Sequence, residues 1–217
     1  MKIGVLGTGM VGQTIATKLF HIGHEVKMGS RTADNAKAIE WTKDKGHCAT
    51  NGTFADAASF GPLVFNCTSG GASLEALNLA GAENLKGKIL IDVANPLDFS
   101  KGMPPSLIPS LSNTTSLGEE IQKAFPDTKV IKTFNTMNCL LMVNPSLVPG
   151  DHDVFVCGND AHAKEAVKAM LTEEFGWKSI VDLGDISGAR GTEQLLPIWI
   201  RLYGINKSPN FNFKIVK

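Results

Sequence analysis

Short apolar runs rich in Val and Ile alternate along the chain with longer segments in which apolar residues recur every three to four positions. The short runs predict strands, and their nearly continuous apolar character is typical of strands covered on both faces. The first longer segment, residues 10–21, places Val11, Ile15 and Leu19 on one helix face and is followed by Gly23. This alternation predicts successive βαβ units around a parallel sheet, and therefore an α/β fold.

Gly, Pro and Asn residues bound most of the short runs and so define the predicted strand ends. A second helix is expected over residues 32–45, with Thr32 as its N-cap and Asp34 in its first turn. In the first two thirds of the chain we expect strands at residues 2–6, 25–28, 48–50, 63–67, 88–93 and 129–134.

The pattern changes after residue 134. Residues 135–150 hold two prolines and four Asn or Gly residues, which predicts an irregular connection. We therefore predict a Rossmann-type domain with a doubly wound, mostly parallel sheet over residues 1–150. A small C-terminal α/β domain over residues 151–217 is expected to pack against it and to contribute to the substrate pocket or to dimerisation. In the second domain a strand, a helix, a strand and a last helix, kinked or restarted at Pro197, are expected at residues 154–157, 161–175, 179–183 and 187–203.

Composition narrows the class of protein. The 217 residues carry 21 Lys and Arg against 21 Asp and Glu, so there is no net charge to attract nucleic acid or an acidic membrane surface. The long charge-free stretches contain Gly, Pro and Asn, which disfavours a membrane span. The four cysteines are far apart and form no C-x-x-C pair, which suits a reducing compartment. We expect a soluble, cytoplasmic protein with no nucleic-acid or membrane partner.

Residues 7–12 have the pattern G-x-G-x-x-G, directly after the first strand and directly before the first helix. In that context Gly7 allows a tight turn, Gly9 lets backbone amides approach a pyrophosphate, and Gly12 lets the helix pack closely on the strand. A glycine-rich turn without a ligand is the alternative, and the match of strand, turn and helix disfavours it. We predict a dinucleotide cradle formed by Gly7, Thr8, Gly9, Met10, Val11 and Gly12.

The end of the second strand indicates which dinucleotide binds. An NAD site has an Asp or Glu there, which accepts hydrogen bonds from the adenosine ribose. This chain has Ser30 and Arg31 instead, and a guanidinium suits the 2′-phosphate of NADP. Lys37, one turn into the next helix, is a further candidate. The alternative is that Ser30 caps a helix and Arg31 is a solvated surface charge.

Ligands of open α/β sheets bind beyond the carboxyl ends of the strands, so the residues that follow the later strands are also candidates. They are mostly small or amide-bearing, which suits contacts to ribose, pyrophosphate and carboxamide. Any one of them taken alone is equally well explained as ordinary loop capping. The cofactor candidates from these strand ends are Thr68, Ser69, Gly70, Asn95, Pro96, Asn135 and Thr136.

No histidine follows a predicted strand end in residues 1–150, and no spacing of Cys and His predicts a metal site. We therefore assign no catalytic side chain and no metal ligand. A dinucleotide site without an obvious proton donor suits hydride transfer between two planar cofactors, in which the protein supplies stacking and distance. The second cofactor would be a flavin or a deazaflavin.

The chain resembles the NADPH-dependent reductases of coenzyme F420, an 8-hydroxy-5-deazaflavin, over nearly its whole length. This resemblance implies a Rossmann domain with a small C-terminal domain, a homodimer, and hydride transfer between nicotinamide and the deazaflavin ring. In the archaeal enzymes a histidine follows the sixth strand, where this chain has Asn135. The resemblance is carried by residues 7–12, 29–31, 92–97, 132–136, 182–184 and 189–191.

The same fold also resembles the cytoplasmic reductase domain of membrane ferric reductases, which pass electrons from NADPH to flavin. Two further hypotheses stay open: a non-catalytic NADP-binding module that senses redox state, and a reductase of a small carbonyl or imine. In the C-terminal helix Arg190, Glu193, Trp199 and Arg201 are candidates for pocket or dimer contacts. The alternative gives Trp199 to the packing stripe and Arg201 to solvent.

Overall fold

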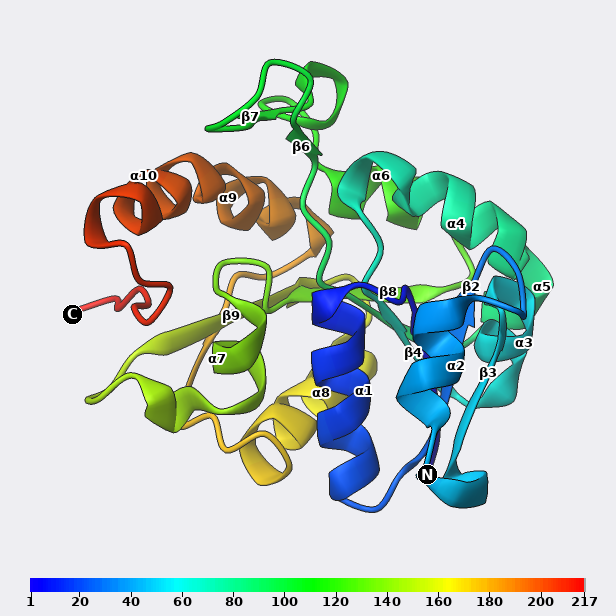
Figure 1. The fold of residues 1–217 in the computed structure, drawn as a ribbon. Helices are drawn as coiled ribbons and strands as arrows, with labels where there is room; N and C mark the ends of the chain where they lie inside the picture. Colours follow the sequence, from blue (N-terminus) through cyan, green and yellow to red (C-terminus); the bar gives the residue numbers. More distant parts are fainter. Residues whose placement is uncertain (217) are drawn as a thin grey trace.

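Eight strands of the computed structural model, which describes residues 1–216, form one sheet in the order β10-β9-β8-β5-β4-β1-β2-β3 (Figure 1). All neighbouring pairs are parallel except β8 and β9, which are antiparallel. The predicted α/β, Rossmann-type fold is thereby confirmed. The strands are β1 (Lys2–Leu6), β2 (Glu25–Ser30), β3 (Ala49–Thr53), β4 (Leu63–Asn66), β5 (Ile89–Asp92), β8 (Lys129–Thr133), β9 (Asp153–Gly158) and β10 (Ser179–Asp182).

Helices cover both faces of this sheet (Figure 1). One core cluster joins the sheet to α1, α2, α7 and α8 through residues such as Leu19, Trp41 and Val167, and a second joins it to α3–α6 through Leu77 and Ile121. Each fully buried Leu or Ile contributes about 1.5–3 kcal/mol to the free energy of unfolding. The helices are α1 (Met10–His21), α2 (Ala36–Thr42), α3 (Phe54–Phe60), α4 (Ser73–Ala80), α5 (Ala82–Leu85), α6 (Leu117–Ala124), α7 (Cys139–Val143), α8 (Ala161–Glu173), α9 (Ala189–Gln194) and α10 (Leu196–Asn206).

The short antiparallel pair β6 (Leu97–Asp98) and β7 (Ser106–Leu107) forms a separate arm that projects from the body at the top of Figure 1. Within residues 1–216 no helix has the length and apolar character needed to cross a lipid bilayer.

The second helix begins four residues later than predicted. Asn35, and not Thr32, is its N-cap: the Asn35 side chain accepts hydrogen bonds from the backbone N–H groups of Lys37 and Ala38. The Thr32 carbonyl instead accepts the hydroxyl of Ser30, so residues 32–34 form a turn that continues from β2. The helix also ends earlier, at Thr42.

The prediction of an irregular connection over residues 135–150 is wrong at its centre, because α7 occupies Cys139–Val143. Asn138 caps this helix by accepting from the N–H groups of Leu140 and Leu141. The interruption expected at Pro197 is confirmed: α9 ends at Gln194, and Pro197 lies in the first turn of α10.

Strands on both sides of residue 150 belong to the same sheet. β9 pairs with β8, with Thr133 opposite Val156, and β10 extends the sheet by one more strand. The division into two domains at residue 150 stays a prediction. The helix α9, which follows β10, packs on α6 and thereby brings the C-terminal segment to the carboxyl ends of the central strands.

Candidate cofactor site

A cleft of about 370 Å³ lies beyond the carboxyl ends of β1, β2, β3 and β4, at the edge of the sheet where α1 begins. The turn after β1, the end of β2 and the loop after β4 form its walls, and one side of α4 closes it. Its lining residues are Gly7, Thr8, Gly9, Ser30, Arg31, Asn35, Phe54, Cys67, Thr68, Ser69, Ala72 and Ala76.

The three glycines of the turn after β1 are needed for different structural reasons. Gly7 has a φ of +115°, which side chains rarely adopt, and a Cβ on Gly12 would lie 2.1 Å from the Gly7 carbonyl oxygen. A Cβ on Gly9 would meet nothing within 4 Å. Gly7 and Gly12 are therefore required by the packing of the turn, whereas the absence of a side chain at Gly9 leaves space in the cleft itself.

The N-terminus of α1 opens onto this cleft. Gly9 is the N-cap of the twelve-residue helix, no side chain of the described residues caps it, and its first turn carries no acidic residue. The positive end of the helix dipole and its free N–H groups therefore face the cleft. Gln13 donates a hydrogen bond of 3.0 Å to the Thr8 carbonyl oxygen and holds the turn in this shape. The arrangement suits an anion such as a pyrophosphate.

Arg31 follows β2 at the mouth of the cleft. Its side chain is 62% exposed, and its Nε lies 3.3 Å from Oε1 of Glu75 on α4. Ser30 is buried, and its hydroxyl donates to the Thr32 carbonyl oxygen at 2.5 Å, so its oxygen still has lone pairs to offer. No carboxylate occupies the end of β2 itself, since β2 ends in Gly29 and Ser30.

The loops after β4 and β5 touch each other beside the cleft. A Cβ on Gly70 would lie 2.1 Å from the Asn95 carbonyl oxygen, so only glycine permits this approach. The Asn95 side chain donates to the Asn135 carbonyl oxygen at 2.8 Å, and the Asn135 side chain donates to Asn95 Oδ1 at 3.0 Å. This pair of amides joins the segments that follow β5 and β8.

The structure brings seven of the predicted cofactor residues into the cleft: Gly7, Thr8, Gly9, Ser30, Arg31, Thr68 and Ser69. Met10, Val11 and Gly12 form the first turn of α1 directly behind it. Gly70, Asn95, Pro96, Asn135 and Thr136 do not line the cleft but form the connected loops beside it, where Asn135 and Thr136 are almost wholly buried. Lys37 is exposed in the first turn of α2 and does not line the cleft. The binding roles of all these residues stay predictions.

Sequence reasoning missed five residues that line the cleft: Asn35, Phe54, Cys67, Ala72 and Ala76. Phe54 follows β3 directly, so the strand-end rule applied to the later strands would have found it. Asn35 had the signal of a helix N-cap. Cys67 contributes to the wall of the cleft, and burial raises the pKa of its thiol well above the usual value, which disfavours the reactive thiolate.

The C-terminal candidates make contacts inside the protein. Arg190 forms two hydrogen bonds with the Glu119 carboxylate, at 2.5 and 2.8 Å. Trp199 stacks on Tyr203 and Phe211, which agrees with the alternative of a packing role. Glu193 is buried, and its Oε1 lies 2.8 Å from Lys132 Nζ. Arg201 is exposed beside Met103 of the arm between β6 and β7.

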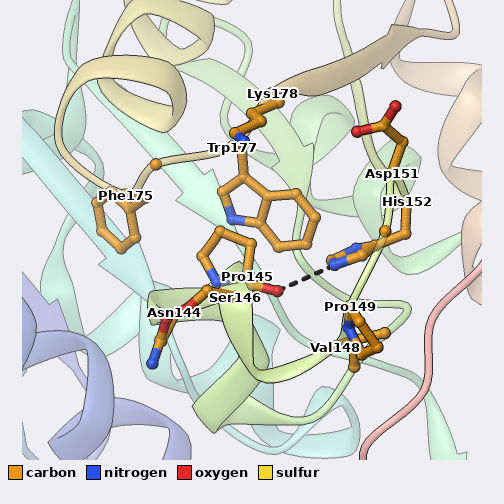
Figure 2. A pocket seen from close by; sticks show the side chains of 12 residues that line it. Asn144, Pro145, Ser146, Val148, Pro149, Asp151, His152, Phe175, Trp177 and Lys178 are labelled. Carbon is orange, nitrogen blue, oxygen red and sulfur yellow. Dashed lines mark hydrogen bonds between the residues drawn. The ribbon is translucent and has the colours of Figure 1, made fainter.

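A second hollow, of about 390 Å³, lies near residues 144–152 and 175–178 (Figure 2). Its histidine is bonded within the protein: His152 Nε2 lies 3.0 Å from the Pro145 carbonyl oxygen (Figure 2), and His152 Nδ1 lies 2.9 Å from the Asn212 side chain. Trp177 donates to the Met142 carbonyl oxygen. The hollow contains none of the predicted cofactor residues, and the cleft at the strand ends remains the candidate site.

Comparison with known proteins identifies the family of the chain. A family model described as NADP oxidoreductase, coenzyme F420-dependent, matches residues 2–96, which contain the glycine turn, Arg31 and the loops after β4 and β5. The F420-dependent NADP reductase of Methanocaldococcus jannaschii is 30% identical, over 99% of this chain and 98% of its own. A crystal structure of a candidate F420-dependent NADP reductase from Arthrobacter sp. FB24 is 53% identical, covers both chains completely and has a TM-score of 0.94.

A third relative, the Metalloreductase STEAP3 of Rattus norvegicus, is 29% identical over 91% of this chain, which spans 38% of the length of that relative. The matches that cover the full length of both chains show the family. They confirm the prediction of an NADP-dependent oxidoreductase. The chain belongs to the coenzyme F420-dependent NADP oxidoreductase family.

Proposed function

We propose that this chain binds NADP(H) in the cleft between β2 and β4 and transfers a hydride between the nicotinamide and a deazaflavin, coenzyme F420. The observation that carries the proposal is the placement of three features in one cleft: the glycine turn, the uncapped N-terminus of α1, and Arg31 where an NAD site would have a carboxylate. The family and its full-length reductase relatives support the same acceptor.

The residues present fit a dinucleotide. The open space above Gly9 and the N–H groups of the first turn of α1 suit a pyrophosphate. Arg31 and Ser30 lie at the adenosine end of the cleft, where a guanidinium would pair with a 2′-phosphate. The aromatic side chain of Phe54 and the small side chains of Ala72 and Ala76 give the cleft apolar walls.

The chain's own contribution to the reaction is binding and orientation. Among the described lining residues, only Arg31 and Cys67 carry ionisable side chains, and the Cys67 thiol stays protonated. NADPH would supply the hydride when it is bound, and the one proton that reduction of the deazaflavin also consumes would come from water. The paired amides of Asn95 and Asn135 fix the loops beside the cleft, and we assign these loops to the nicotinamide half of the cofactor.

The acceptor is tested by mixing the purified protein and NADPH with F420, FMN, FAD and a ferric chelate in turn, while loss of nicotinamide absorbance is followed. We expect turnover with F420 and none with the ferric chelate alone. Turnover with FMN or FAD but not F420 would replace the deazaflavin by a flavin. Tight NADPH binding without turnover on any acceptor would favour a redox-sensing module instead.

A further inference from the structure

Three charged side chains meet in the core, away from the cleft. Lys132 on β8 is wholly buried, and its Nζ lies 2.7 Å from Asp92 Oδ2 on β5 and 2.8 Å from Glu193 Oε1 on α9. Its third donor bonds the Ala94 carbonyl oxygen at 2.5 Å. The ammonium therefore has an acceptor for each of its three N–H groups. We call Asp92, Lys132 and Glu193 the buried triad.

The charges of the triad are held in place by further bonds. Glu193 also accepts the N–H groups of Leu117 and Gly118 in the first turn of α6, at 2.8 and 3.1 Å, which suits a carboxylate. Burial raises the pKa of Glu193, and Lys132 opposes that rise. Burial alone would lower the pKa of Lys132, but the two carboxylates outweigh it and raise that pKa, so Lys132 stays charged.

The triad reaches the cleft through Asn66. The Asn66 side chain donates to Asp92 Oδ1 at 2.8 Å and to the Ser73 hydroxyl at 3.2 Å. Asn66 Oδ1 accepts the hydroxyl of Thr68 at 2.6 Å, and Thr68 lines the cleft. Asp92 Oδ1 also accepts the N–H of Ala94 at 3.3 Å. One hydrogen-bonded chain therefore runs from α9 to both loops, 66–70 and 94–96.

Stability alone is a weak explanation for this cluster. Taking charges out of water costs several kcal/mol per ion, and replacing a buried ion pair by neutral groups of similar volume is often neutral or stabilising. A network with fixed donors and acceptors has a different effect, because it allows only one arrangement of the backbone segments that it joins. The segments joined here are those that the proposed function assigns to the dinucleotide.

We propose that the buried triad is a positioning device: Lys132, Asp92 and Glu193 hold the loops 66–70 and 94–96 in the geometry that productive binding of the nicotinamide half requires. The expected effect of the triad on turnover rests on the proposed function. The expected effect of the triad on the conformation of the loops does not depend on that function. This inference also gives the C-terminal segment an indirect part in the reaction, because Glu193 belongs to α9. Glu193 does not line the cleft and would act only through the triad.

The test compares the parent protein with the variant Asp92→Asn/Lys132→Met/Glu193→Gln, which removes all three charges and nearly preserves volume. Lys129→Met is the matched control, because Lys129 lies on the same strand but forms its ion pair, 3.6 Å to Asp160, at the surface. The readouts are melting temperature, hydrogen exchange of the amides in 66–70 and 94–96 without cofactor, binding of 2′,5′-ADP, and kcat and KM for NADPH.

We expect exchange in both loops to be at least tenfold faster in the triple variant, 2′,5′-ADP binding to stay within about twofold, and kcat to fall about tenfold to a hundredfold, since small misplacements have effects of that size. The control should match the parent in all four. Exchange and kcat within twofold of the parent would overturn the positioning role. If the triple variant does not fold, Glu193→Gln decides: severalfold faster exchange and lower kcat support the role, and no change in either overturns it.

The two proposals fail in different ways. A parent protein that neither binds nor oxidises NADPH would contradict the proposed function, while the exchange measurement would still decide whether the triad fixes the loops. A parent that oxidises NADPH, with variants that match it in exchange and kcat, would leave the function standing and remove the positioning role.

Discussion

Arg31 and Glu75 face each other across the mouth of the cleft, one at the end of β2 and the other on α4, with Arg31 Nε 3.3 Å from Glu75 Oε1. Both side chains are more than half exposed, so this pair adds little to stability. Its importance lies in its position, because the guanidinium that would hold a 2′-phosphate already has a carboxylate beside it. Glu75 would therefore compete with a bound 2′-phosphate for Arg31.

Glu75→Gln should tighten NADPH binding. The substitution removes the competing negative charge and keeps the side-chain volume, so we expect the Kd for NADPH to fall about twofold to fivefold, in line with an exposed ion pair of up to about 1 kcal/mol. The Kd for NADH should not change. Calorimetry at two salt concentrations checks this, because the gain should shrink at high salt. An unchanged or weaker NADPH affinity in low salt would contradict it.

Arg31→Ala should weaken the binding of NADPH and leave the binding of NADH unchanged. A charge-assisted contact contributes about 1.5–3 kcal/mol, which corresponds to a rise in the NADPH KM of about tenfold to a hundredfold. Steady-state kinetics with both nucleotides measure the change, and Lys43→Ala serves as the control, because Lys43 is an exposed cation that does not line the cleft. Equal effects of Arg31→Ala on NADPH and NADH would show that Arg31 does not read the 2′-phosphate.

Gly9→Ser should separate ligand binding from folding. Serine is a preferred N-cap and Gly9 has an ordinary extended backbone, so the melting temperature should stay the same or rise. The new side chain would project into the space above the turn and occupy the N–H groups of α1, so NADPH affinity should fall at least about tenfold, or about 1.4 kcal/mol.

The control for Gly9→Ser is Gly191→Ala, at an exposed helix position where a Cβ also meets nothing within 4 Å. It should stabilise the protein slightly and leave binding unchanged. A Gly9→Ser protein that binds NADPH as tightly as the parent would exclude the first turn of α1 from the site.

Much of the first βαβ unit could be predicted from the sequence, because its signals are local. The glycine turn marks the start of the helix that follows it and Gly23 marks its end, and the predicted bounds of residues 10–21 agree with α1. The helix α3 was missed although Thr53 and Asp56 form a capping box, a signal that lies in four consecutive residues. The sequence therefore contains enough local information to predict α3.

Other parts of the site depend on contacts between distant segments. Glu75 lies 44 positions from Arg31, and the helix α4 that presents it was not predicted. Lys132 within an apolar strand signals a buried charge that needs partners. Its partners Asp92 and Glu193 lie on another strand and on a helix far along the chain, so only the strand order of the sheet reveals them.

Asp153 should make the C-terminal tail sensitive to acid. Its buried carboxylate accepts the Ser179 hydroxyl at 2.6 Å and the N–H of Ile215 at 2.5 Å, and Lys214 lies 3.4 Å away. Burial alone would raise the pKa of Asp153, but these contacts outweigh it and the pKa lies below its usual value.

A lowered folded-state pKa means that the stabilisation is present above about pH 4 and is lost as the pH falls through the folded pKa. Asp153→Asn should therefore lower the free energy of unfolding at pH 7 by about 1.5–3 kcal/mol and flatten its decline below pH 4. Urea unfolding at pH 7 and pH 3 measures both effects, with exposed Asp151→Asn as the control. A variant that loses as much stability on acidification as the parent would contradict the assignment.

The proposed preference for NADP(H) depends most on the end of the cleft where Arg31 stands in place of a carboxylate. The most direct test is calorimetry of the parent protein with NADP⁺ and NAD⁺ under the same low-salt conditions. We predict that NADP⁺ binds at least about tenfold more tightly, equal to about 1.4 kcal/mol. Equal affinity for the two nucleotides, or no binding of either, would contradict the proposed binding of NADP(H) through Arg31.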